Sequence, residues 1–437
     1  MSVAAFMFPL LFVLVLTGIP IAFSLIVVSA GAGLLAFGPH VFGQLYGSFY
    51  SAATNFILSA IPMFVLMGAI LERSGIAERL FRVMQIWLGR LPGGLAVATI
   101  AMGAVFAAAA GVVGAVEVMI GMMAIPAMQR YRYKNSLIAG TICAGGSLGT
   151  MIPPSVIAVM YAALAQISVG ELLAGMMLPG LLMIVLFIAY LIIQGMIDPP
   201  EPVDFVDDIA TMSLREKLWV TLTSMLPICA LIFAVLGSLL AGIASPTEAA
   251  AVGAVGALLL CILYGRFSLT MLRESLKITV RISAMILLIV AAGTMFMGTF
   301  AANGGSRLIR DAVEAAGFGN AGMIVFFLLI VLLLGFVLDW TANVLICVPL
   351  FAPFIRQAGI DPIWFGTMAI IVIQTSYLTP PMASSIFYLK SIAPPDMTYG
   401  QMCRGVVPFI LLQLATLAIV ALFPALATWL PSQIVGF

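Results

Sequence analysis

Two stretches of this chain combine hydroxyl-bearing residues with paired prolines inside segments that are otherwise apolar. They are GGSLGTMIPPS at residues 145–155 and QTSYLTPP at residues 374–381. A proline inside a helix removes a backbone donor and clashes with the preceding turn, so neither stretch can continue as a regular helix. Carbonyl groups freed at such a break, together with Ser and Thr hydroxyls, are oxygen ligands that suit Na⁺, and the amino end of a half-helix suits an anion.

We therefore expect an ion and substrate site at two unwound loops, one in each stretch. The candidate Na⁺ ligands in these loops are Gly145, Ser147, Gly149 and Thr150 in the first, and Thr375, Ser376 and Thr379 in the second. The candidate substrate contacts there are Pro153, Ser155, Gln374 and Pro380. A structural role is the alternative, because Ser and Thr commonly satisfy the backbone groups that a proline frees.

Two acidic residues also stand in apolar surroundings, where a charge costs several kcal/mol unless it is paired or hydrated. Asp339, in VLDWTANV, is expected to cap a helix, to bind Na⁺, or both. Beside it, Thr341 is a candidate Na⁺ ligand and Asn343 a candidate substrate contact. Glu117, in VGAVEV, is a candidate substrate contact, and pairing with a cation, binding a proton or pointing into a hydrated crevice are open alternatives.

The composition places these residues in a membrane. The chain has 437 residues, of which 63% are hydrophobic and 8% are charged, and its mean hydropathy is +1.23. A soluble fold needs more polar surface than this. Apolar runs of about 20 residues recur along the chain, each long enough to cross the hydrocarbon layer. We predict an all-α polytopic membrane protein.

Several classes of function are not expected. The sequence has no Ser/His pairing, no zinc-ligand spacing and no acidic dyad within one helical turn, so we expect no enzyme and no catalytic residue. The five cysteines are widely spaced and His40 is the only histidine, so no metal other than Na⁺ is expected. We also expect no organic cofactor and no nucleic-acid partner, and no phosphate loop for ATP occurs.

The candidate spans fall into two sets that a polar linker at 197–217 separates. The first set is about 3–17, 19–37, 52–71, 135–165 and 171–196, and the second is about 218–241, 246–265, 281–302, 361–390 and 403–430. Two further blocks, 92–129 and 320–357, are nearly twice the length of a span and have small or polar residues at their middle. Such blocks are typical of re-entrant hairpins.

One shift aligns the two sets. Pro153 pairs with Pro380 because 380 − 153 = 227, and the same shift pairs Pro126 with Pro353. Five crossings per copy is an odd number, so the second copy must be inverted. Inverted repeats with a broken helix at corresponding places are typical of secondary transporters. The predicted units are a first repeat at 1–196, with an arm at 72–90 and a discontinuous helix at 135–165, and a second at 218–437, with an arm at 302–317 and a discontinuous helix at 361–390.

The basic residues orient the chain. With the N-terminus outside, 15 of the 18 Lys and Arg residues fall at cytoplasmic ends, and only Arg307, Arg310 and Arg356 fall outside. Both termini are therefore predicted on the outer side, and the linker on the cytoplasmic side.

Six motifs resemble the large membrane subunit of TRAP (tripartite ATP-independent periplasmic) transporters. They are AIPMFVLMGAILERSGIAERL, LPGGLAVATI, GGSLGTMIPPS, SPTEAAAVGAVGALLL, GIDPIWFG and QTSYLTPPMASSIFYL, and the resemblance runs in order from about residue 5 to 430. It implies an elevator-type ion-transporter fold in the bacterial inner membrane, with both termini periplasmic. It also implies uptake of a small organic acid with Na⁺, a separate small four-helix membrane subunit, and a soluble periplasmic binding protein that delivers the substrate.

The tip of the first hairpin departs from the family pattern. Many members have a Gly-Ser-Ser-type tip there, whereas this chain has AGVVGAVEV. Hydroxyl ligands are missing from this tip, and we expect the backbone carbonyls of Gly111 and Val112 to contribute to the Na⁺ site instead. The tip resembles a branch that handles organic acids such as 2-oxo, hydroxy or aromatic acids.

Two other functions stay open. A proton-coupled carrier on the same scaffold would load Glu117 or Asp339 with H⁺. A non-transporting structural or redox-complex membrane subunit is the second alternative. It is disfavoured because such subunits usually bury lysines in a chain across the membrane, and all four lysines here lie at predicted span ends.

Overall fold

The computed structural model describes residues 3–110, 113–199, 212–315, 317, 319–381 and 383–433, which form α-helices joined by turns and short 3₁₀ segments. The first helices are α1 (Val3–Leu16), α2 (Ile21–Phe37), α3 (Val41–Ala53), α4 (Ala60–Arg73), α5 (Ile76–Leu88), α6 (Gly94–Ala110), α7 (Val113–Arg130), α8 (Asn135–Ser147), α9 (Val156–Ala165) and α10 (Val169–Ile197). The others are α12 (Leu214–Leu240), α13 (Pro246–Leu263), α14 (Leu269–Ala302), α15 (Gly305–Ala315), α16 (Asn320–Gly335), α17 (Trp340–Gln357), α18 (Pro362–Leu378), α19 (Ser384–Lys390), α20 (Tyr399–Leu422) and α21 (Ala425–Gln433).

Many of these helices are apolar enough for a membrane. Within the described residues, seven segments have the length and composition to cross one, the longest being Leu269–Ala302. Shorter apolar helices, among them Asn320–Gly335 and Pro362–Leu378, lie between them. The predicted fold class, an all-α polytopic membrane protein, is confirmed.

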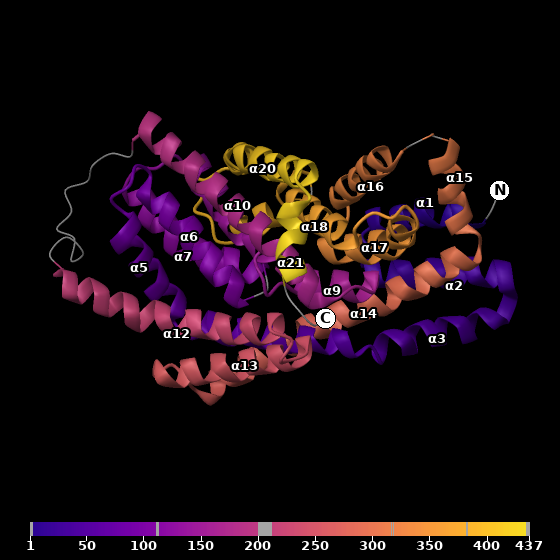
Figure 1. The fold of residues 1–437 in the computed structure, drawn as a ribbon, viewed down its shortest axis with the longest axis horizontal. Coiled ribbons are helices and arrows are strands. Elements are labelled where there is room, and N and C mark those ends of the chain that lie inside the picture. The colour runs from indigo at the N-terminus through magenta and orange to yellow at the C-terminus, as the bar shows by residue number, and fades with distance from the viewer. Residues whose placement is uncertain are drawn as a thin grey trace.

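The helices form two groups (Figure 1). α3, α12, α13 and α14 follow one long side of the molecule, where α4 packs against both α13 and α14. Above them in this view, α6 and α7 lie at the left, and α9, α17 and α18 lie nearer the centre. There α8 packs against α6, α7 and α20, while α18 packs against α16, α17 and α20. The central group contains the stretches that the sequence predicts to be functional.

Both helices that the sequence predicts to be broken are interrupted at their proline pairs. α8 ends at Ser147, a 3₁₀ turn spans Leu148–Thr150, and α9 begins only at Val156. α18 ends at Leu378 and α19 begins at Ser384. The reason is local, because a proline offers no backbone donor and disfavours helical geometry in the residue before it.

The two double-length blocks are helix pairs. Hairpin one consists of α6 and α7, and hairpin two consists of α16 and α17, which meet at residues 336–339. The two helices of each pair pack against each other: α6 contacts α7, and α16 contacts α17. The tip of hairpin one includes Gly111 and Val112, which lie outside the described residues.

Several helix boundaries differ from those predicted. α3 is absent from the prediction, because VFGQLYGSFYSAA has polar residues and glycines that lower its hydropathy. α12 begins at Leu214, inside the predicted linker, and α14 begins at Leu269, twelve residues before the predicted span at 281. The last predicted span, 403–430, is two helices, because Pro424 follows the end of α20.

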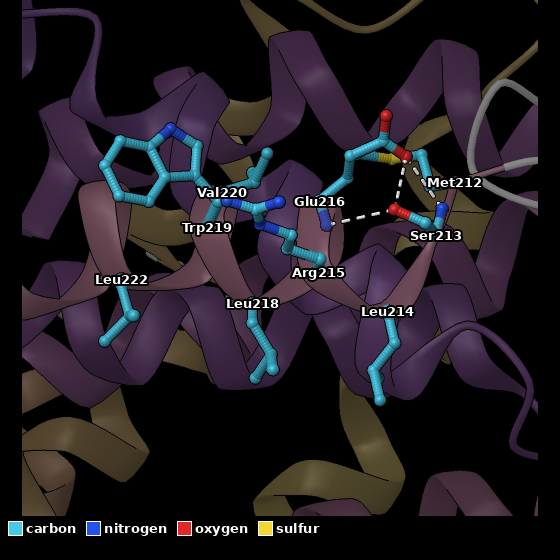
Figure 2. A pocket seen from close by; sticks show the side chains of 9 residues that line it. All are labelled: Met212, Ser213, Leu214, Arg215, Glu216, Leu218, Trp219, Val220 and Leu222. Carbon is cyan, nitrogen blue, oxygen red and sulfur yellow. Dashed lines mark hydrogen bonds between the residues drawn. The ribbon is translucent and has the colours of Figure 1, made fainter.

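Side-chain caps explain the early starts of α12 and α14. Ser213 Oγ accepts from the Glu216 amide, and the Glu216 carboxylate accepts from the Ser213 amide at 2.7 Å (Figure 2). Ser268 caps α14 by accepting from the Met271 amide at 3.0 Å. Such caps satisfy amide groups that the first turn leaves without partners.

Candidate functional site at the two helix breaks

The two interrupted helices touch at the centre of the molecule. Gln374 Nε2, on α18, donates to Ser147 Oγ, at the end of α8, over 3.2 Å. Both side chains are fully buried. Gln413 Nε2, on α20, also approaches Ser147 Oγ, at 3.5 Å. Candidate residues that are far apart in sequence therefore share one buried polar cluster.

This cluster has spare oxygen acceptors. Ser147 Oγ donates to the Ala144 carbonyl at 2.8 Å, so its proton is used. The amide oxygens Oε1 of Gln374 and Gln413 are buried without a hydrogen-bond partner among the described residues. A buried polar atom without a partner is costly, and carbonyl-type oxygens are good ligands for hard cations. These oxygen atoms are therefore chemically suitable ligands for an ion such as Na⁺.

The other hydroxyl groups at the breaks donate to nearby backbone carbonyls. These bonds run from Thr150 to Ser147, from Ser155 to Thr150, from Thr375 to Ile371, from Ser376 to Ile373 and from Thr379 to Thr375, with lengths of 2.7–2.8 Å. This is the structural role that the sequence left open. A hydroxyl oxygen that donates keeps its acceptor lone pairs, so ligation of Na⁺ by these residues stays a prediction.

One local prediction at the second break is wrong. Gln374, Thr375 and Ser376 do not belong to an unwound loop, because they lie within α18. Pro380 restricts the residue directly before it, Thr379, which has extended backbone angles. Residues further back keep their helical hydrogen bonds. Ser147 is likewise the last residue of α8.

The first unwound region is shorter than predicted, because Gly145 belongs to α8. Gly145 lies in α8, where α6 passes so close that a Cβ on Gly103 would be 2.8 Å from the Gly145 carbonyl oxygen. Gly149 lies in the 3₁₀ turn. Pro153 is buried between α8 and α9, while Pro380 is half-buried between α18 and α19.

Asp339 caps the amino end of α17, at the tip of hairpin two. Its carboxylate accepts from the Thr341 amide at 3.2 Å and from the Thr341 hydroxyl. The capping role is confirmed, and binding of Na⁺ by Asp339 or Thr341 stays a prediction. Asn343 is fully buried, and its Nδ2 donates to the Val331 carbonyl at 2.8 Å. Asn343 therefore ties the two helices of hairpin two together.

Hairpin two lies directly against α18. A Cβ on Gly335 would be 2.2 Å from Ser376 Oγ and 3.0 Å from Asn343 Nδ2. Side chains cannot approach that closely, so a glycine is required where the tip meets the helix. The contact brings Asn343 beside the candidate ligands of the second break.

Glu117 connects hairpin one to the second break. Its side chain is fully buried. It accepts from the Ser385 hydroxyl at 2.7 Å and from the Tyr377 hydroxyl at 3.2 Å. Sequence reasoning singled out Glu117 but not Tyr377, Ser385 or Gln413. The available signal for Gln413 was a lone amide in the apolar run FILLQLATLAIV.

Two surface pockets of the described residues contain none of the candidate ion or substrate ligands. One is at the amino end of α12, where Leu214, Leu218 and Leu222 point to one side and the Ser213–Glu216 cap occupies the polar groups (Figure 2). Another lies along α14 between Leu269 and Arg281. Neither contains a candidate residue from the sequence.

Known proteins resemble the chain along nearly its whole length. A family model described as "Tripartite ATP-independent periplasmic transporter, DctM component" matches residues 8–426. The C4-dicarboxylate TRAP transporter large permease protein DctM of Pseudomonas aeruginosa is 31% identical over 408 residues, 92% of this chain and 93% of that one. The ectoine/5-hydroxyectoine TRAP transporter large permease protein UehC of Ruegeria pomeroyi is 31% identical over 437 residues, 98% of each. Among solved structures, the YdaH transporter of Alcanivorax borkumensis matches with a TM-score of 0.61 at 16% identity, over 94% of this chain and 97% of that one, which is a likeness of fold.

Proposed function

Because the chain belongs to the DctM family of TRAP transporter large permeases, we propose that it takes up a small organic acid together with Na⁺ by an elevator movement. The observation that carries the proposal is the contact between the two interrupted helices at Ser147 and Gln374. In secondary transporters, broken helices meet near the midplane of the bilayer because their free ends and carbonyls bind substrate and ions there.

The Na⁺ ligands that we propose are the oxygen-bearing groups around the breaks and the hairpin tips. Gln374 and Gln413 contact Ser147, a member of this set, and their buried amide oxygens have no hydrogen-bond partner among the described residues, which supports a cation site at this place. The set comprises Gly145, Ser147, Gly149, Thr150, Asp339, Thr341, Thr375, Ser376 and Thr379, with Gly111 and Val112 at the tip of hairpin one.

The substrate that we propose is a carboxylate. One relative is named for C4-dicarboxylates. The amino end of α9 follows the first break, and a helix amino end favours negative charge. Ser155 precedes that end, while Gln374 and Asn343 lie near the second break. Pro153 and Pro380 keep the two breaks open beside these contacts.

Two inverted repeats are part of the proposal. Adding 227 to Val113 and to Asn135, the first residues of α7 and α8, gives 340 and 362, the first residues of α17 and α18. Ser147 and Gln374, which touch, are also 227 residues apart. Contact between two corresponding residues supports a pseudo-two-fold axis through that point. The 227-residue shift also relates α7 to α17 and α9 to α19, and the contacts agree with it, because α7 packs against α19 and α17 packs against α9.

The movement would involve the central helices. We propose that the two hairpins and the two interrupted helices travel together against the remaining helices, that hairpin one also separates from the second break during the cycle, and that α5 and α15 act as bracing arms. The partners would be a small four-helix membrane subunit and a soluble periplasmic binding protein, in keeping with the tripartite, periplasmic family description. The location would be the bacterial inner membrane, with both termini in the periplasm.

A flux measurement tests the coupling. The chain would be reconstituted in liposomes with its small subunit and binding protein, after a thermal-shift screen of the binding protein against organic acids has identified the acid to use. We expect an inward Na⁺ gradient to drive uptake of that acid, and an equal K⁺ gradient to drive none. Uptake that is the same with either cation would refute Na⁺ coupling.

A further inference from the structure

Glu117 is exceptional among the charged residues. Within the described part of the chain, it is the only Asp, Glu, Lys or Arg that is fully buried. It lies on α7 and accepts hydrogen bonds from Tyr377, near the end of α18, and from Ser385, in α19. A single carboxyl group therefore joins hairpin one to both sides of the second break.

The carboxyl group is also enclosed from the side of the first break. A Cβ on Gly146 would be 1.9 Å from Glu117 Cγ, so the α8 backbone lies directly against the Glu117 side chain. Tyr377 and Ser385 are themselves buried, at 5% and 0% exposure. The Glu117 side chain is therefore enclosed by α8 on one side and by two buried hydroxyl-bearing side chains at the second break.

The neighbouring groups do not neutralise a carboxylate at this place. The ionisable side chains that interact with it are Cys143 on α8, Tyr377 on α18 and Tyr388 on α19, none of them basic. No ion pair joins Glu117 to any residue that the structure describes, and α6, which also packs against α7, has no charged residue.

The charged groups on the helices that pack against α7 lie elsewhere. Lys390, at the end of α19, has its Nζ over the Tyr399 ring, and Arg79 lies over the Tyr264 ring. Arg130 ends α7, thirteen residues beyond Glu117, which is about 20 Å along a helix. The remaining charges on these helices are Glu72 and Arg73 on α4 and Glu78 and Arg82 on α5.

An ionised carboxylate buried among these groups costs several kcal/mol, because none of the described side chains that interact with it is positively charged. A proton removes this cost and needs no additional space. Tyr377 and Ser385 hydroxyls can accept as well as donate, so they can also partner a protonated carboxyl group.

We propose that Glu117 carries a proton while hairpin one is docked, that is, while Glu117 contacts Tyr377 and Ser385 on the two sides of the second break. Glu117 releases the proton when hairpin one separates from the second break, so that H⁺ moves in the transport cycle in addition to Na⁺. In the release step the carboxyl O–H bond breaks, and the proton passes to water on the side that opens. In the return step water supplies a proton to the carboxylate as the hairpin docks. The transport part of this inference rests on the proposed function, whereas the protonation of Glu117 does not.

Infrared spectroscopy tests the protonation directly, without substrate or partner proteins. The full chain in lipid nanodiscs would be compared with Glu117→Gln at pH 7, in H₂O and D₂O, with and without NaCl. We expect the wild-type spectrum to contain a protonated carboxyl band, sensitive to D₂O, that Glu117→Gln lacks. The matched control is Glu248→Gln, which changes an exposed carboxylate that caps α13 and should keep the band.

Identical carboxyl bands in wild type and Glu117→Gln would overturn the proposal, and so would loss of the band when NaCl is added. If Glu117→Gln does not fold, Tyr377→Phe and Ser385→Ala answer the same question, because both keep the carboxyl group. Each removes a donor that stabilises the ionised form, so the band should persist to higher pH than in wild type. An unchanged pH dependence in both variants contradicts the proposal.

A second measurement follows the proton during transport. Proteoliposomes with the complete system and a trapped pH dye would receive the acid from the binding-protein screen, with Na⁺ equal on both sides. We expect acid entry to be accompanied by a change in internal pH. Acid entry without any pH change overturns the transport part. Absence of acid uptake under the inward Na⁺ gradient of the flux measurement described above refutes the proposed function instead, and the infrared result still decides whether Glu117 is protonated.

Discussion

Asp339 combines two roles that one substitution can separate. It caps α17 through the Thr341 amide, and its charge stands at the tip of hairpin two, where we propose Na⁺ to bind. Asn caps helices about as well as Asp does, whereas Ala does not. The two replacements therefore remove different properties of the same side chain.

For Asp339→Asn we expect thermal stability close to wild type, since the cap remains. The Na⁺ concentration for half-maximal uptake should rise about tenfold, which corresponds to about 1.4 kcal/mol of lost binding free energy, because the carboxylate charge that would face Na⁺ is removed. Asp339→Ala should additionally lose about 1 kcal/mol of stability, the usual effect of removing a cap. Thermal unfolding and Na⁺ titration of uptake check the two parts, and an unchanged Na⁺ requirement in Asp339→Asn would limit Asp339 to capping.

At the scale of elements, α8 and α20 are held close by glycines. A Cβ on Gly140 would be 2.1 Å from the Gly405 carbonyl oxygen, and a Cβ on Gly405 would be 1.9 Å from the Ser136 carbonyl oxygen. Small residues allow helices in membranes to approach closely. This approach also brings Gln413 of α20 to Ser147 at the first break.

We expect Gly140→Ala to destabilise the protein by about 1–3 kcal/mol, the usual effect of overpacking, because the new methyl group meets backbone that cannot rotate away. A lower temperature of unfolding in detergent is the measurement. Gly400→Ala is the matched control on α20, since no atom lies within 4 Å of its added Cβ. Equal stability of the two variants would show that the close approach of α8 and α20 is not required.

The sequence predicted the elements better than their contacts. The proline pairs and the 227-residue shift predicted where α8 and α18 break, because a proline acts on its own segment. Glu117 shows the limit: its hydrogen-bond partners Tyr377 and Ser385 are 260 and 268 residues away. Nothing local to VGAVEV identifies them. Gln413 was missed for the same reason, since its meaning depends on meeting Ser147.

At the scale of the whole molecule, an elevator requires the central helices to slide along the others. α14 belongs to the long side of the molecule and α17 to hairpin two, and the two pack together (Figure 1). An ideal Cβ on Gly293 of α14 would lie 3.1 Å from Leu345 Cβ of α17. Cysteines with Cβ atoms about 3.5–4.5 Å apart can form a disulfide, so a small adjustment at this contact suffices.

We expect the pair Gly293→Cys and Leu345→Cys, in a background without the five native cysteines, to join α14 to α17 on oxidation. The bond would hold hairpin two at one position along α14, so Na⁺-driven uptake should stop after oxidation and return after reduction. Each single-cysteine variant is a control and should transport equally under both conditions. Full uptake by a completely cross-linked protein would mean that hairpin two does not travel along α14, because a covalent bond at their contact forbids that displacement whatever the substrate or coupling ion.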